Sequence, residues 1–189
     1  MAARVLRRGG NGEYVGLDVS ATSTGIVVLS GNPAASVLLA ETVTVPGRGI
    51  ERAAGVADVV FDLVDRRGAK AAVEGYAHGG PGLAVLVEVG ALVRDRLRAA
   101  GVPWDDVAPS RLKKFVLGSG KGDKGQVRLA AFKRWGFEHD SDDVVDAYVL
   151  ARIARALDGL DSGSLGKAQA EVVESIRGGP KTKRRRRAG

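Results

Sequence analysis

The stretch YVGLDVSATSTGIVVL, at residues 14–29, predicts two β-strands joined by a short polar turn. Its first strand carries a carboxylate, Asp18, where a buried strand would carry another aliphatic side chain. Because side chains alternate along a strand, Asp18 shares a face with Gly16 and Tyr14. Two interpretations are open at this point. Either Asp18 lies on a solvated face of the sheet, or it is a buried acid with a chemical role.

The rest of the chain predicts one α/β domain with a mixed five-stranded sheet, in which three antiparallel strands precede parallel ones and helices lie on the flanks. Predicted strands span 14–19, 25–30, 36–45, 71–77 and 104–109, and predicted helices span 49–70, 82–101, 124–135, 143–157 and 167–177. Pro109 is expected to end the fifth strand, since proline cannot donate to a sheet. The expected units are a flexible N-terminus (1–13), the domain (14–158), a Gly/Ser-containing linker with a short helix (159–179) and a disordered basic tail (180–189).

Charge and composition limit the classes of function. The 189 residues include 29 Lys and Arg against 22 Asp and Glu, and six of the basic residues lie in PKTKRRRRAG at 180–189, so the remainder is close to neutral. Such a tail binds polyanions such as nucleic acid without reading sequence, unless it serves solubility alone. The absence of cysteine excludes disulfides and cysteine-bound zinc. No segment has the pattern of a membrane helix or a signal peptide, so we expect a cytoplasmic protein without membrane contact.

The predicted helix at 82–101 is apolar around most of its circumference. Its apolar residues include Leu83, Val85, Leu86, Val87, Val89, Leu92 and Val93. A helix of this kind is expected to be buried on most faces. It is either a central core helix, part of a second layer, or the contact with a partner subunit.

A second acid stands at the end of an apolar strand. Glu74 follows AAV in the predicted strand AAVEGYA at 71–77. Glutamate is disfavoured in strands and is rarely buried without a partner. The carboxyl end of a strand in an α/β sheet is also the usual place for a ligand site.

Two more acids lie on the apolar side of a predicted helix. On a helical wheel of residues 142–157, Asp146 falls near the centre of the apolar stripe and Asp143 falls within its width. Arg152 and Arg155 fall on the opposite side, which we expect to be solvated. The two aspartates are therefore predicted to point toward the core.

Four carboxylates that converge need a counter-charge, because like charges close together raise one another's pKa. Oxygen ligands without His or Cys favour Mg²⁺ or Mn²⁺ over zinc. Two such ions, roughly 3.5–4 Å apart, form the arrangement that promotes in-line attack on a phosphodiester. The acids Asp18, Glu74, Asp143 and Asp146 therefore predict a two-metal phosphodiester-cleaving site.

The segment LKKFVLGSGKGDKGQVR, at residues 112–128, makes a candidate phosphate contact. Its glycines let the backbone approach a phosphate closely, and its cations supply charge and hydrogen-bond donors. Lys113 or Lys124 could also stabilise charge that develops on the phosphate. The cations are Lys113, Lys114, Lys121, Lys124 and Arg128. The alternative is a solvated, flexible loop.

Four segments, in their order and spacing, resemble the RuvC-type Holliday junction resolvases, the crossover junction endodeoxyribonucleases of bacteria and phages. They are GLDVSATSTGIVVL, AAVEGYA, APSRLKKFVLGSGKGDKGQV and DDVVDAYVLARI, and the likeness spans about residues 14–157. The first motif also occurs in actin-like ATPases, but those need a duplicated second half for which this chain has no room. The lysine–glycine segment followed by the acidic helix is the more specific signal.

The resemblance implies an RNase H-like fold and a homodimer that makes paired, symmetric nicks in branched DNA, namely four-way junctions, during recombination and repair. The implied cofactor is Mg²⁺, with Mn²⁺ as a substitute, at two ions per site. A branch-migration helicase is a further candidate partner.

The same resemblance implies roles for individual residues. The implied metal ligands are Asp18, Glu74, Asp143 and Asp146, which with Lys124 are also the implied catalytic residues, and Asp142 replaces Asp143 if the register shifts by one. The implied DNA contacts are Lys113, Lys114, Lys121, Lys124 and Arg128. Tyr76 resembles an aromatic residue that intrudes at the junction, although it stands one position early.

Two other functions remain open on the sequence. A related nuclease of the RNase H fold that acts on other branched or RNA-containing substrates would share the same acids. A non-catalytic nucleic-acid-binding protein of this fold would have no need of four intact acids.

Overall fold

A computed structural model of the chain describes residues 12–20, 22–64, 69–76 and 83–178. The strands are β1 (Glu13–Asp18), β2 (Thr24–Ser30), β3 (Val37–Val43), β4 (Ala69–Glu74) and β5 (Trp104–Val107). The helices are α1 (Gly49–Leu63), α2 (Leu83–Ala100), α3 (Pro109–Leu117), α4 (Lys124–Trp135), α5 (Asp142–Leu157), the 3₁₀-helix η1 (Ser162–Ser164) and α6 (Lys167–Arg177). Residues 1–11 of the expected N-terminus and the basic tail at 180–189 lie outside the described residues.

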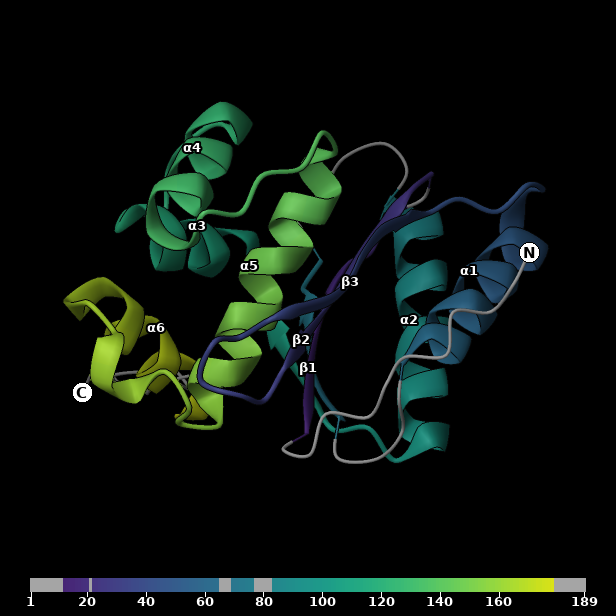
Figure 1. Ribbon diagram of the computed structural model, residues 1–189. Coiled ribbons are helices and arrows are strands. Elements are labelled where there is room, and N and C mark those ends of the chain that lie inside the picture. The colour runs from purple at the N-terminus through teal and green to yellow at the C-terminus, as the bar shows by residue number, and fades with distance from the viewer. Residues whose placement is uncertain (1–11, 21, 65–68, 77–82, 179–189) are drawn as a thin grey trace, which may run out of the picture.

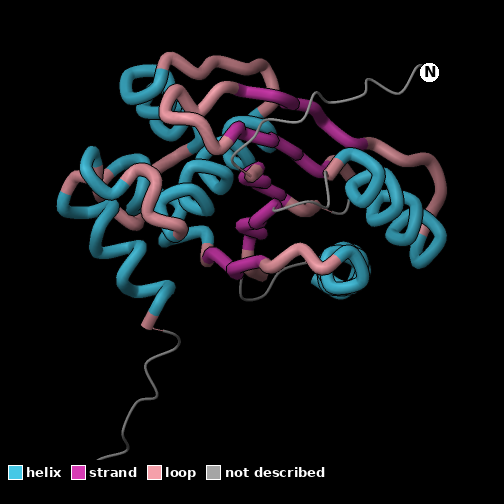
Figure 2. Tube along the Cα trace, turned by 60° about the horizontal axis from the view of Figure 1, so that its bottom comes forward, coloured by secondary structure: helices cyan, strands magenta, loops and turns pink. Residues whose placement is uncertain are grey.

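The five strands form one mixed sheet in the order β3-β2-β1-β4-β5, which confirms the predicted sheet. Strands β1, β2 and β3 pair antiparallel, whereas β4 pairs parallel with both β1 and β5. The parallel pairs follow from helical connections, since α1 precedes β4 and α2 precedes β5. Helices α1 and α2 cover one face of the sheet, and α5 with α3, α4 and α6 lies on the other (Figures 1 and 2).

Two glycines allow helix α5 to lie directly against the sheet. A Cβ atom at Gly16 of β1 would stand 1.8 Å from the carbonyl oxygen of Ala147, and one at Gly25 of β2 would stand 2.0 Å from that of Asp143. Real Cβ atoms do not approach backbone this closely. The absence of a side chain at both positions therefore brings the start of α5 onto the ends of β1 and β2.

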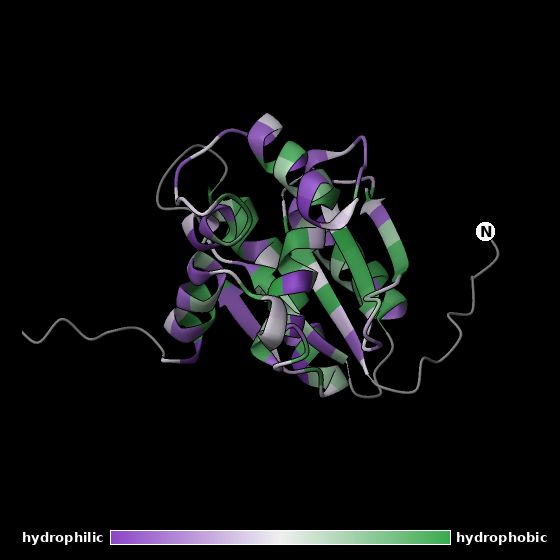
Figure 3. Cartoon of the chain, turned by 60° about the vertical axis from the view of Figure 1, so that its left-hand side comes forward, coloured by the Kyte–Doolittle hydropathy of each residue, from purple (hydrophilic) through white to green (hydrophobic). Residues whose placement is uncertain are grey.

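Helix α5 is the central helix of the domain. It is buried on nearly every side, and Figure 3 shows hydrophobic strands in the middle of the sheet beside a largely hydrophilic one. The prediction that Arg152 and Arg155 face solvent is wrong, because α3, α4 and α6 pack outside α5. Arg155 is 1% exposed, donates to the carbonyl oxygen of Ser30 and pairs with Asp161 at 3.1 Å.

Helix α2 is not the central core helix that its composition allowed. Only Val89, Gly90, Val93 and Leu97 are buried. Val87 is 40% exposed, and the two leucines in the first half of the helix, Leu83 and Leu86, are half-buried. Within the described residues, Val87 is the one large apolar side chain of α2 that is exposed, whereas Val85, Leu86 and Leu92 pack against the core beside α1. The reading of α2 as a contact with a partner subunit therefore remains.

Two further differences concern α3 and α6. The fifth strand ends at Val107, and Pro109 begins α3, where a missing N–H costs nothing. Residues 112–117 are therefore helical rather than part of a loop. Helix α6, expected within a linker, places Val172 and Val173 in the same core as α5, so the folded unit extends to Arg177. None of the described helices is long and apolar enough to cross a membrane.

Candidate active site

The four predicted acids meet at one end of the sheet. Asp18 is the last residue of β1 and Glu74 the last of β4, and the parallel register pairs their neighbours Leu17 and Val73. The two carboxyl groups therefore leave adjacent strands side by side, and each acts on the pKa of the other. Asp143 and Asp146 come from the first turns of α5, which lies over this end of the sheet.

Burial and mutual repulsion dominate the electrostatics of these acids. Asp18 is 7% exposed, and burial, followed by the charge of Glu74, raises its pKa to about 9. Burial and then the charge of Asp18 raise the pKa of Asp146 to about 7. The pKa of Glu74 is also raised, chiefly by burial, although its hydrogen bond with Asp18 opposes the shift. The cluster therefore lacks enough positive charge of its own to keep every acid ionised at neutral pH.

The structure separates Asp142 from Asp143. Asp143 accepts a hydrogen bond of 2.5 Å from the Ser23 hydroxyl, and its charge acts on Asp18 and Glu74. Asp142 instead forms an ion pair with Arg128 at 2.6 Å, whose hydrogen bond lowers the pKa of Asp142. Asp143 thus belongs to the acid cluster, and Asp142 belongs to a pair with cations of α4.

Of the predicted cations, Lys113 and Lys124 act on the acid cluster. The charge of Lys113 offsets part of the rise in the pKa of Glu74. The charge of Lys124 does the same for Asp18 and Asp146. Lys113 also donates to the carbonyl oxygen of Gly122 at 2.8 Å, which holds its ammonium group over the loop between α3 and α4.

The remaining predicted cations have other surroundings. Lys124 lies 3.6 Å from Asp142 and remains exposed, like Lys121 in the loop before it. Lys114 pairs with Glu171 of α6 at 2.7 Å, so its charge is directed to the helix–helix contact rather than to the acids. Arg128 is held by Asp142 and by the carbonyl oxygen of Asp140.

Two neighbours of the acids are residues that sequence reasoning missed. Ser23, in the polar turn between the first two strands, orients Asp143, and the signal for it was the serine-rich turn itself. Arg94 of α2 donates to the carbonyl oxygen of Glu74 at 3.1 Å and stacks over the ring of Tyr76 at 4.9 Å. Tyr76 is 37% exposed. No sequence spacing signals Arg94, because α2 and the end of β4 meet only in the fold.

The donor chemistry of the cluster fits a divalent cation. Its ligand atoms are carboxylate oxygens, which Mg²⁺ and Mn²⁺ prefer, and a bound cation would offset the repulsion that raises their pKa values. In the described residues no three His, Cys, Asp or Glu side chains are already arranged as a metal site. Asp18 and Glu74 lie close enough for each to shift the pKa of the other.

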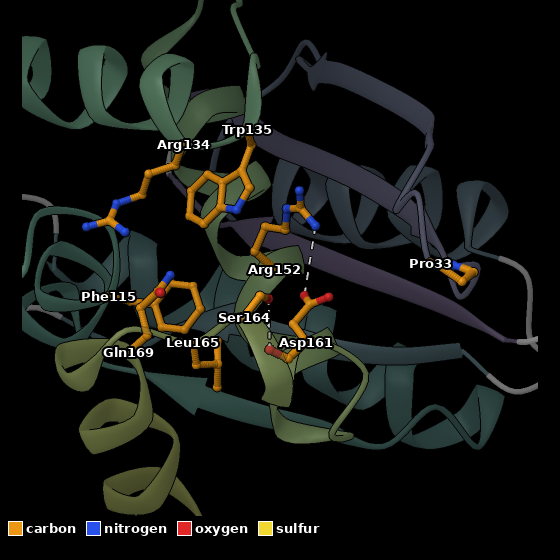
Figure 4. A pocket seen from close by; sticks show the side chains of 9 residues that line it. All are labelled: Pro33, Phe115, Arg134, Trp135, Arg152, Asp161, Ser164, Leu165 and Gln169. Atoms are coloured by element: carbon orange, nitrogen blue, oxygen red, sulfur yellow. Dashed lines mark hydrogen bonds and ion pairs between the residues drawn. The ribbon is translucent and has the colours of Figure 1, made fainter.

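A pocket of about 330 Å³ lies elsewhere, between α3, α4, α5 and η1 (Figure 4). None of the four acids lines it. Its polar side chains have partners within the protein: Arg152 lies over the ring of Trp135 and pairs with Asp161, and the Gln169 side chain accepts from Gly166. This pocket contributes to the packing of the helices outside α5.

Comparisons with known proteins support the fold. The sequence matches no protein-family model and none of the curated proteins. The solved structure of RuvC from Thermus thermophilus is 23% identical, with a TM-score of 0.64, and the match covers 80% of this chain and 95% of that one. T. thermophilus RuvC in complex with a Holliday junction substrate is also 23% identical, with a TM-score of 0.65, covering 78% and 96%.

A third structure, the yeast mitochondrial Holliday junction resolvase Ydc2, is 10% identical with a TM-score of 0.46, covering 84% of this chain and 82% of that one. The two RuvC structures share the mixed five-stranded sheet with helices on both faces over nearly their whole length. The chain therefore has the fold of RuvC, an RNase H-like fold.

Proposed function

We propose that this protein is a metal-dependent endonuclease that resolves four-way DNA junctions by paired, symmetric nicks. The observation that carries the proposal is the convergence of Asp18, Glu74, Asp143 and Asp146, from three separate elements, at one end of a RuvC-like sheet. An acid cluster this costly to bury is retained for binding cations rather than for stability. The RuvC structure with a Holliday junction substrate supplies the substrate class that fits the fold.

The four acids would hold two Mg²⁺ or Mn²⁺ ions. Bound there, the ions supply Lewis-acid chemistry that lowers the pKa of a water and offsets charge on the phosphodiester. Ser23 holds the Asp143 carboxylate in place through its hydroxyl. Lys124, exposed beside the acids, neutralises charge on the scissile phosphate, and Asp142 limits how far its side chain moves.

The cations outside the acid cluster would position the DNA. Lys113, Lys121 and Arg128 lie on or near the loop between α3 and α4, next to the start of α5. Contacts of this kind with phosphates set the register of the duplex without reading its sequence. Tyr76, partly exposed at the end of β4, would contact bases at the branch point.

We also propose that two copies of the chain pair through α2. Paired nicks in opposing strands need two active sites, and α2 carries the exposed apolar side chain of Val87 beside the half-buried Leu83 and Leu86. A symmetric dimer through one helix would place the two sites in a fixed relation.

The proposal is tested by incubating the full chain with a synthetic four-way junction and with a linear duplex of the same sequence, in Mg²⁺, Mn²⁺ or EDTA. The expected result is symmetric nicking of the junction alone, lost in EDTA. Asp146→Asn should abolish cleavage and keep junction binding, because it removes an acid of the cluster but no DNA contact. Equal cleavage of the linear duplex, or cleavage in EDTA, would refute the proposal. Preferential cutting of RNA-containing substrates would favour a related nuclease of the same fold.

A further inference from the structure

We propose that Arg94 of α2 is a positioning residue that holds the end of β4, and with it Glu74 and Tyr76, in the geometry that cation binding requires. The inference deepens the proposed nuclease function and rests on it. Arg94 contacts the backbone carbonyl of Glu74 rather than its carboxylate, so it acts on the acid cluster through the backbone.

The contacts of Arg94 join three elements. Its Nη2 donates to the Glu74 carbonyl oxygen at 3.1 Å and to Oδ1 of Asp106 at 2.6 Å, and its Nε donates to the same oxygen of Asp106 at 2.9 Å. Asp106 belongs to β5, Glu74 to β4 and Arg94 to α2. The side chain of Arg94 is 13% exposed and that of Asp106 is 58% exposed, so the bond to the Glu74 carbonyl oxygen is the more shielded of these contacts. One guanidinium plane thereby fixes the ends of two parallel strands against a helix.

The same guanidinium holds Tyr76. Its central carbon lies 4.9 Å from the centre of the tyrosine ring, and Nη1 donates to the tyrosine hydroxyl at 3.3 Å and to the carbonyl oxygen of Gly90 at 2.9 Å. A Cβ atom at Gly90 would stand 2.8 Å from both Nη1 and the tyrosine hydroxyl. The absence of a side chain at Gly90 is therefore what makes room for the stacked pair on α2.

The contact of Arg94 with Glu74 matters because it lies at the last peptide of β4. Glu74 is the last residue of β4, and the next amide, that of Gly75, donates to the Val107 carbonyl oxygen at 2.8 Å. The Glu74–Gly75 peptide is thus held by β5 through its N–H and by Arg94 through its C=O. Beyond it the chain leaves the sheet, so without Arg94 the strand end would lose one of two anchors. A displaced carboxylate binds a cation poorly, since groups that orient metal ligands typically contribute roughly 10–100-fold to affinity.

The test compares Mn²⁺ binding, measured by titration calorimetry on the full chain, for wild type, Arg94→Gln, Arg94→Lys and Arg98→Gln. Arg98 is the matched control, because it lies on the same helix and, among the residues that the structure describes, its side chain pairs only with Asp95 one turn away. We expect Arg94→Gln to weaken Mn²⁺ binding roughly tenfold and to raise the Mn²⁺ concentration needed for half-maximal nicking. Arg94→Lys should be intermediate, and Arg98→Gln should match wild type. In Arg94→Gln, the affinity for the junction in the absence of metal should fall by a smaller factor than the affinity for Mn²⁺.

Two further variants keep the test decisive if Arg94→Gln fails to fold. Asp106→Asn leaves Arg94 in place but weakens its anchor, and Gly90→Ala displaces the guanidinium from the side of α2. Both should weaken Mn²⁺ binding while retaining a cooperative melting transition. If the folded Arg94 and Asp106 variants bind Mn²⁺ as tightly as wild type, the inference about Arg94 is wrong, and the proposed nuclease function is unaffected. Failure of the wild-type chain to bind Mn²⁺ or to nick junctions would instead overturn the proposed function.

Discussion

At the scale of single residues, the acid cluster is defined by what surrounds each carboxylate. Asp142 and Asp143 are adjacent in sequence, yet Asp142 pairs with Arg128 while Asp143 is held by Ser23 among other acids. Successive residues of a helix point about 100° apart, so the first turn of α5 can give one aspartate to α4 and the next to the strands. Asp142 therefore lies beside cations, and its neighbour Asp143 lies among other carboxylates.

The two adjacent aspartates should respond differently to removal of their charge. Asp143→Asn is expected to reduce nicking by roughly 100-fold, the upper end of the loss that follows from removing a group that orients a metal ligand, with junction binding preserved. Asp142→Asn should keep most of the activity, because its partners are cations of α4. Single-turnover nicking of a labelled junction measures both. Equal losses in the two variants would show that Asp142 shares the metal-binding role.

The acids also predict how stability depends on pH in the absence of metal. In the folded chain Asp18 has a pKa of about 9 and Asp146 of about 7, above the value of about 4 expected when unfolded. The folded state therefore binds more protons between these values, and ∂ΔG/∂pH of unfolding is negative there. The stabilising contribution is complete below about pH 4 and is lost as pH rises through about 7 and then about 9.

Urea unfolding in EDTA at a series of pH values measures this dependence. Asp146→Asn should remove the step near neutral pH, and Mg²⁺ should stabilise the wild type more at pH 8 than at pH 5, because cations bind the ionised acids. A midpoint that rises steadily from pH 5 to pH 9 in EDTA would show that the acids are not buried together as described.

At the scale of elements, the site depends on how closely α5 lies on the sheet. Gly16 and Gly25 leave no side chain between β1, β2 and the helix backbone, so the start of α5 reaches the strand ends where Asp18 and Glu74 stand. The helix is buried on its other sides by α3, α4 and α6, which keep it pressed to the sheet. Helix α5 therefore contributes both the core of the domain and two of its four acids.

Gly16→Ala tests this close approach. The added Cβ would stand 1.8 Å from the Ala147 carbonyl oxygen and 2.5 Å from the Ala151 amide nitrogen, so the helix must move. We expect a loss of about 3 kcal/mol in the free energy of unfolding, measured by urea denaturation. Gly163→Ala is the control, because no atom lies within 4 Å of its added Cβ. A Gly16 variant as stable as this control would show that α5 does not contact β1 directly.

At the scale of the whole molecule, the two faces of the sheet have different surroundings. One face is covered by α5 and three further helices, and the other carries α1 and α2 (Figure 1). Val87 of α2 is exposed on the second face, and Leu129 and Phe132 of α4 are exposed on the first. The acid cluster lies at the sheet end, and Arg94 of α2 contacts the backbone of one of its members, Glu74.

A charge placed on the exposed side of α2 should separate the proposed dimer. Val87→Asp is expected to convert the protein from dimer to monomer in analytical ultracentrifugation, because a buried unpaired carboxylate opposes association. Leu129→Asp, at a comparably exposed apolar position on α4 across the sheet, should leave the dimer intact. A monomeric wild type, or a dimer that tolerates Val87→Asp, would contradict pairing through α2.

The basic tail at 180–189, which lies outside the described residues, carries a separate prediction. Deleting it should lower the salt dependence of DNA binding by about 5 in log–log slope at most, since each neutralised phosphate contributes about 0.9, and should leave junction selectivity unchanged. Binding across a salt series to junction and duplex measures both quantities. If deletion of the tail abolishes junction selectivity, the segment between α3 and α4 is not the main DNA contact.

The sequence by itself determined the sheet, its mixed topology and the acids that line its end. Strand alternation, helical spacing and the misplaced charges at Asp18, Glu74 and Asp146 are local patterns, and local patterns can be read without knowing which elements touch. The start of α3 at Pro109 was also readable from proline at a first helical position, but the glycine-rich residues after it suggested a loop.

Only the tertiary structure decided which side chains share an environment. It placed Arg155 in the core, Lys114 against α6, Asp142 with Arg128 and Arg94 at the end of β4. It also left α2 partly uncovered while burying α5 on nearly all sides, the reverse of what their compositions suggested. These outcomes depend on contacts between residues far apart in the chain, and no periodicity along one segment records which other segment will cover it.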